Sequence, residues 1–210
     1  MKPLFWLAAL AVGLSGAAGA RPVSYPGGWT LLQNNDGMAN SLWVHYSPTA
    51  QYSLGYFGAY DRAEEQTAHT VRATRLVRRW NEKASQGNLY AWAALGAALP
   101  GDGGTAEGAG LAGVSADWET RRVFVMGEAK AAQIGDKADM ELAGRLGFAP
   151  YVGDYGDLHL WLMLQVHNKP TATEPLVTTP MARLFWDVNL VELGWQVETE
   201  TVMFNWIIRR

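Results

Sequence analysis

The stretch that most constrains the fold is residues 157–168, which read DLHLWLMLQVHN. Every second position from Leu158 to Val166 holds a large aliphatic side chain, while the positions between them hold imidazole, indole, thioether and amide groups. Because successive side chains of a strand point to opposite faces, one face of this strand would be pure hydrocarbon and the other mixed and polar. A tilted strand of roughly 10 residues can cross the apolar core of a bilayer. The stretch therefore predicts a membrane-spanning β-strand.

The same pattern recurs more weakly along the chain, and no window of useful length has a helical period stronger than its strand period. An even number of antiparallel strands with alternating faces is typical of barrels in the bacterial outer membrane. We therefore predict an all-β fold, a closed antiparallel transmembrane β-barrel of about 12 strands. The predicted strands are residues 28–34, 40–46, 52–61, 67–80, 87–97, 107–117, 121–130, 138–149, 157–166, 175–185, 189–197 and 201–209.

The N-terminus has the features of an export signal. Lys2 supplies the positive region, residues 4–14 are apolar, and Ala18 and Ala20 fit the small-residue rule for cleavage. The apolar part is too short to favour a membrane anchor. We predict a signal peptide at residues 1–20, a single barrel domain at residues 21–210, and a location in the cell outer membrane.

Composition excludes several classes of function. With no cysteine, the chain can have no disulfide, thiolate metal site or cysteine nucleophile. Net charge is -3 and no block of Lys and Arg stands out, so nucleic acid is not an expected partner. Mean hydropathy is only -0.09, which is compatible with a barrel because alternation dilutes the hydrophobicity of each strand.

The predicted connections alternate between short turns and longer polar loops, as they do in outer-membrane barrels. Aromatic residues gather at the strand ends on the short-turn side, which is the periplasmic side in such barrels. Amphipathic rings favour the interface between membrane and water. We therefore expect an aromatic girdle there, made of Trp29, Tyr46, Tyr52, Trp80, Trp118, Tyr151 and Trp186.

Charged residues occupy the alternate strand positions, called here the lumen-facing phase, whose side chains would point into the barrel. Unpaired ions are unfavourable beside a low-dielectric wall, so one interpretation is a mutually paired network that fills a narrow barrel. The other is a pore lining that sets selectivity. The predicted lumen-lining residues are Glu128, Lys130, Glu141, Arg145, Arg183 and Glu192.

The predicted strand at residues 67–80 does not divide cleanly into two faces. Arg72, Arg75, Arg78 and Arg79 cannot all point inward. We predict a β-bulge in this strand, or an early exit from the membrane.

Thioether and imidazole groups on the same phase raise the possibility of metal binding. Together these groups suit copper(I). However, His159 and Met163 lie about 13 Å apart along one strand, so other strands would have to contribute ligands. Methionine is also used as an adaptable filler of cores. The candidate metal set is His45, His159, Met126, Met163, Met181 and Met203.

Catalysis has weaker support. Some 12-stranded outer-membrane barrels are lipid hydrolases, which need a serine beside a histidine. The strand serines are Ser41, Ser53 and Ser115, and none is predicted beside a histidine on the lipid-facing phase. The sequence therefore favours a protein that does not catalyse a reaction.

The preferred hypothesis for the function is a small pore or structural envelope barrel with no cofactor. The alternatives are a copper-handling barrel, a lipid-modifying barrel enzyme, and a soluble periplasmic ligand-binding barrel whose apolar phase points inward.

Four motifs carry a resemblance that spans nearly the whole mature chain. They are YPGGWT at residues 25–30, HYSPTA at 45–50, APYVGDYGDLH at 149–159 and FNWIIR at 204–209. Together they resemble a family of uncharacterised proteobacterial exported proteins of outer-membrane β-barrel type. The resemblance implies export. The final motif also resembles the terminal strand by which such proteins are recognised, so the implied partners are outer-membrane lipid and the barrel-assembly machinery.

Overall fold

The computed structural model describes residues 21–154 and 156–210 of the chain, and the predicted signal peptide lies outside them. No helix in this part of the chain is long and apolar enough to cross a membrane. Twelve strands form within these described residues, and the ends of each lie within four residues of the predicted ends. They are β1 (Gly28–Asn35), β2 (Ala39–Thr49), β3 (Tyr52–Asp61), β4 (Gln66–Asn81), β5 (Ser85–Pro100), β6 (Glu107–Thr120), β7 (Val123–Ile134), β8 (Lys137–Phe148), β9 (His159–Asn168), β10 (Leu176–Trp186), β11 (Asn189–Gln196) and β12 (Thr201–Arg209).

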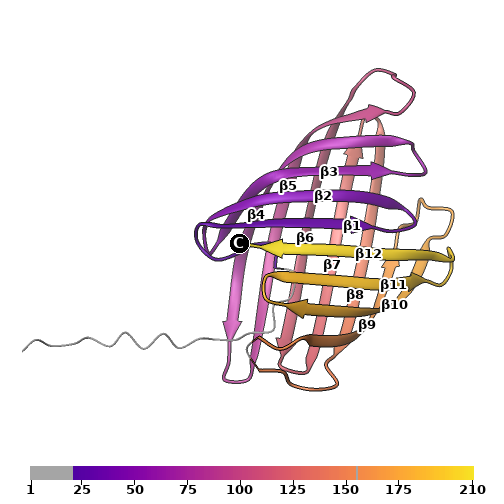
Figure 1. Ribbon diagram of the computed structural model, residues 1–210. Coiled ribbons are helices and arrows are strands. Elements are labelled where there is room, and N and C mark those ends of the chain that lie inside the picture. The colour runs from indigo at the N-terminus through magenta and orange to yellow at the C-terminus, as the bar shows by residue number, and fades with distance from the viewer. Residues whose placement is uncertain (1–20, 155) are drawn as a thin grey trace, which may run out of the picture.

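The strands close into one antiparallel barrel (Figure 1). Each strand pairs with its neighbours in sequence, and the seam joins the first strand to the last. At this seam Thr30 lies opposite Arg209 and Asn35 opposite Phe204. Closure leaves no unpaired strand edge. The predicted fold class, a closed antiparallel barrel of 12 strands, is confirmed.

The two faces of the wall differ as the alternation predicts. In β9, Leu162 and Leu164 are exposed on the outside, while Trp161, Met163 and Gln165 are buried on the inside. The apolar phase therefore points outward, opposite to the arrangement that a soluble ligand-binding barrel requires. Large apolar side chains are exposed in the same way on many other strands, among them Leu54, Val71, Leu95, Val114, Val125, Met140, Leu146, Leu193, Val202 and Phe204.

The bulge predicted in β4 is present. The register with β5 shifts between Leu76 and Arg78. Arg72 is buried inside the barrel, Arg75 and Arg78 are exposed, and Arg79 donates from Nε to Asn88 Oδ1 at 2.7 Å. The extra residue of the bulge thus lets this arginine-rich strand divide its side chains between two environments.

The two ends of the barrel have different connections. At one end the strands are joined by short turns and by the longer segment between β8 and β9, and residues 21–27 lead into β1. The loops at the other end include 101–106 and 169–175. Large aromatic side chains are exposed at the turn end, namely Trp29, Tyr46, Tyr52, Trp80, Trp118, Tyr151 and Trp186.

The barrel lumen as a candidate functional site

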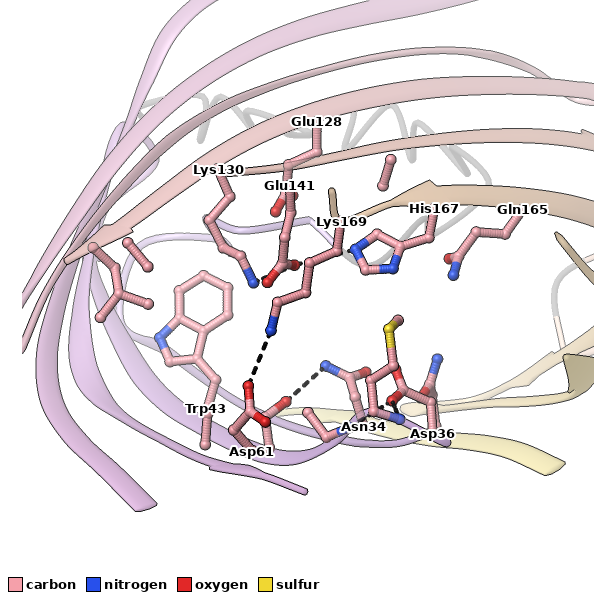
Figure 2. A pocket seen from close by; sticks show the side chains of 18 of the residues that line it. Asn34, Asp36, Trp43, Asp61, Glu128, Lys130, Glu141, Gln165, His167 and Lys169 are labelled. Atoms are coloured by element: carbon pink, nitrogen blue, oxygen red, sulfur yellow. Dashed lines mark hydrogen bonds and ion pairs between the residues drawn. The ribbon is translucent and has the colours of Figure 1, made fainter. Parts of the chain in front are cut away.

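A cavity of about 830 Å³ occupies the lumen (Figure 2). Its lining runs from Arg21 and Pro22 at the turn end to Asp36, Glu64 and Thr171 in the loops at the other end. Between these ends the walls are the inward faces of the strands. All six residues predicted to line the lumen, Glu128, Lys130, Glu141, Arg145, Arg183 and Glu192, contribute to this lining.

Glu192 on β11 is the centre of the most buried charge cluster. Its side chain is 1% exposed. Arg183 donates from Nε to Glu192 Oε1 at 2.7 Å, Arg145 donates from Nη1 at 3.1 Å, and the Asn205 amide donates to Oε2 at 2.7 Å. Gln165 in turn accepts from Arg145 Nε at 2.5 Å. One carboxylate is thus held by two guanidinium groups and an amide, which fix its position and narrow the lumen.

A second cluster lies nearer the loops, around Glu141 on β8 (Figure 2). Lys130 Nζ lies 2.5 Å from Glu141 Oε2, and His167 Nε2 lies 3.1 Å from the same oxygen. Glu128, two residues before Lys130 on β7, forms no ion pair with any described residue. The structure therefore pairs five of the six predicted charges and leaves Glu128 facing the cavity.

A third cluster, around Lys169 in the loop between β9 and β10, was missed by the sequence analysis. Lys169 Nζ lies 3.0 Å from Asp61 Oδ2 (Figure 2). The same atom lies 3.2 Å from Asp139 Oδ2. Burial alone would lower the pKa of Lys169, but hydrogen bonding and attraction to Asp61, with help from Asp139, outweigh it and raise this pKa. The lysine thereby ties the loop to the ends of β3 and β8. Strand alternation could not reveal it, because loop residues have no phase.

A stack of flat side chains was also missed. The Arg72 guanidinium lies over the rings of Trp43 and Trp92, with Cζ 3.9 Å from each centroid. The Phe57 ring is 5.7 Å away, and the His45 ring stacks on Trp43 at 4.3 Å between centroids. All of these except His45 line the cavity. The sequence signal was present in the arginines of β4, but it did not indicate which one turns inward.

The candidate metal residues separate into different surroundings. Met163, Met181 and Met203 pack with Phe124, Ala149 and Trp161, and Met126 packs against this cluster. His45 lies instead against Trp43, and His159 lies against Phe185. No group of three or more histidine and acidic side chains suited to a metal occurs in residues 21–154 and 156–210. The structure thus gathers the four methionines and places neither histidine in their cluster.

The segment of residues 21–25 covers the turn end of the lumen. Arg21 forms an ion pair with Glu119, and Ser53 Oγ donates to the Pro22 carbonyl at 2.7 Å. Val23 is buried against Leu76 and Tyr90. The segment therefore contacts the inside of β3, β5 and β6 and forms the floor of the cavity.

Comparisons with known proteins support the fold. No protein-family model and no curated protein sequence matches the chain. Among solved structures, the KdgM porin is similar with a TM-score of 0.52 and 9% identity, over 87% of this chain and 97% of the porin. A KdgM porin in complex with disordered oligogalacturonate gives 0.51 and 9% over the same shares. OccAB1 from Acinetobacter baumannii gives 0.47 and 8%, over 81% of this chain and 56% of OccAB1. In fold, the chain is a closed antiparallel β-barrel similar to the KdgM porin.

Proposed function

We propose that the protein is a small pore of the cell outer membrane whose lumen is largely filled by its own paired charges. The observation that carries this proposal is the combination of an apolar outer wall with a charged cavity that extends from the loops to the N-terminal segment. An apolar exterior needs lipid, and a polar interior needs water or internal partners.

The exterior supports the membrane location. The exposed aromatic residues at the turn end match the rings that settle at a membrane–water interface. Two exposed arginines of β4 lie over such rings, with Arg75 Cζ 5.7 Å from the Tyr52 centroid and Arg78 Cζ 5.0 Å from the Trp80 centroid. Long cationic side chains at this level can hold their charge in the headgroup region while the stem lies on apolar surface.

The interior supports a narrow path. The clusters around Glu192, Glu141 and Lys169 contain charges of both signs in contact, so their fields largely cancel. We therefore expect small conductance and weak selectivity between cations and anions. The N-terminal segment narrows the turn end further.

The test combines a gel assay with planar-bilayer recording. The refolded protein is expected to migrate differently before and after boiling and to give small conductance steps. A chain that begins at Pro26 lacks the floor of the cavity and should give larger steps. Arg21→Gln keeps the floor segment but loses its ion pair with Glu119, so its conductance steps should lie between those of the full and the shortened chain. Silent bilayers from both the full and the shortened chain, with normal heat-shifted migration, would overturn the pore and leave a structural barrel.

Copper handling is the second candidate, and the clustering of four methionines favours it. Soft thioether ligands select copper(I). Under this hypothesis the purified barrel binds copper(I), and replacement of Met126, Met163, Met181 and Met203 by leucine abolishes binding. Under the pore hypothesis the same four replacements leave conductance unchanged, because leucine fills a similar volume.

A further inference from the structure

We propose that Arg72 is the anchor of a binding site for small carboxylate-bearing solutes inside the lumen. The inference rests on three features of this side chain: its burial, its missing partners, and the two indole rings that lie against it. It does not depend on whether solutes pass through the barrel.

Arg72 is a buried cation without a polar partner. It is only 8% exposed, and no described residue forms a hydrogen bond or an ion pair with it. Its Nε is enclosed and unsatisfied. A buried charged donor left unpaired is costly, so native structures usually supply an acceptor. The other cations on the strands that reach this cavity have such acceptors, as Arg145 and Arg183 do in Glu192.

Two indole rings lie against the Arg72 guanidinium. Trp43 and Trp92 each lie 3.9 Å from Arg72 Cζ. Such contacts stabilise the cation when it is desolvated, but they satisfy none of its N–H donors. The N–H donors of a guanidinium lie in its own plane. A planar carboxylate matches that fork with two parallel hydrogen bonds.

The backbone holds this arrangement in place. Gly113 on β6 lies opposite Trp92, and a Cβ at this position would come within 2.6 Å of the Trp92 ring. A glycine is therefore needed there, because the ring lies directly over the neighbouring strand. The His45 ring against Trp43 supports the other side of the stack. The guanidinium is thus preorganised before any ligand arrives.

Glu128 can be used to test how a nearby negative charge affects carboxylate binding at Arg72. It lines the same cavity without an ion-pair partner and attracts Arg72 electrostatically, although the two form no ion pair. Its carboxylate should repel an incoming anion. Glu128→Gln removes this repulsion without a large change in shape, so it should tighten carboxylate binding rather than weaken it.

The experiment is an NMR titration of the refolded barrel in micelles with sodium acetate, at ionic strength matched with chloride. The Arg72 Nε–H signal is identified by its absence in Arg72→Gln. We expect a saturable downfield shift of this signal and a matching shift of the Trp43 indole N–H. Arg72→Gln should weaken the effect on Trp43 by about tenfold or more, because charge-assisted bonds are among the stronger ones. Glu128→Gln should saturate at lower acetate concentration, and Arg79→Gln, whose guanidinium binds Asn88, should leave the titration unchanged.

Other results would overturn the site. A shift that chloride reproduces, or a response that survives Arg72→Gln, means that acetate acts nonspecifically. Tighter binding of inorganic phosphate than of acetate would overturn the assignment of the site to carboxylates. Absence of any saturable shift in both the natural chain and Glu128→Gln means that water alone satisfies Arg72. Because the assay needs no membrane and no current, a failure here is distinguishable from a failure of the pore.

Discussion

At the scale of the residue, the position of a side chain on the wall decides how a charge is tolerated. Leu162 is 54% exposed on the outer face of β9. An arginine at the middle of a barrel's lipid face costs about 2–4 kcal/mol, so Leu162→Arg should lower the free energy of unfolding in lipid vesicles by about that amount. The matched control is Ala143→Arg on neighbouring β8, because Ala143 lines the cavity. Equal losses for the two would mean that lipid does not surround the barrel.

Glu192, in contrast, is a charge inside the barrel whose removal should destabilise the folded state. Glu192→Ala would leave Arg145 and Arg183 facing each other without their carboxylate. Removal of one partner from a buried ionic network typically costs about 3–5 kcal/mol. We expect a loss of that order in urea unfolding, with a smaller loss for Glu192→Gln, which keeps some acceptors.

The exposed ion pair between Lys137 and Glu64 provides the comparison for this prediction. The two side chains are 68% and 42% exposed, and surface pairs contribute about 0–1 kcal/mol. Glu64→Ala should therefore change stability little. Similar losses for Glu64→Ala and Glu192→Ala would contradict the view that burial makes the Glu192 cluster important.

At the scale of the element, the strands were predictable and the contacts made by the loops were not. Alternation placed every strand and the outward phase of β9, and the arginine count predicted the bulge of β4. The choice of Arg72 as the inward arginine depends on the exact bulge position, between Leu76 and Arg78, which the pattern does not encode. Lys169 could not be placed either, because its partners Asp61 and Asp139 are distant in sequence and meet only when the barrel closes.

The Lys169 cluster predicts a pH dependence for the loop between β9 and β10. The folded-state pKa of Lys169 is raised above its ordinary value of 10.5. The ion pairs therefore stabilise the folded loop fully below the ordinary pKa, and this contribution is lost as pH rises through the raised value. NMR titration of the Lys169 side chain should give a higher midpoint in the folded protein than in urea. Asp61→Asn should lower the folded midpoint, because it removes the attraction of the Asp61 carboxylate that helps to raise this pKa. Identical titration midpoints of Lys169 in the folded and the unfolded chain would show that its ion pairs do not stabilise the loop.

At the scale of the whole molecule, an outward apolar phase and an inward charged phase follow from one alternating pattern. The six predicted residues border the cavity, but the sequence could not say how they pair. Pairing depends on which strands face each other across the lumen, as Arg145 on β8 and Glu192 on β11 do. The barrel radius and the strand tilt set those distances, and the alternation within a single strand determines neither of them.

The seam between β1 and β12 also has a consequence for the order of events in biogenesis. It joins residues as distant as Thr30 and Arg209, and the Arg209 guanidinium donates to the carbonyl of Arg21 in the floor segment. The last strand thus completes the wall and secures the floor in the same step. Contacts at such separation form slowly, and until they form both edge strands are open to mispairing. Until β12 pairs with β1, both strands have an unpaired edge and the floor segment lacks its hydrogen bond from Arg209.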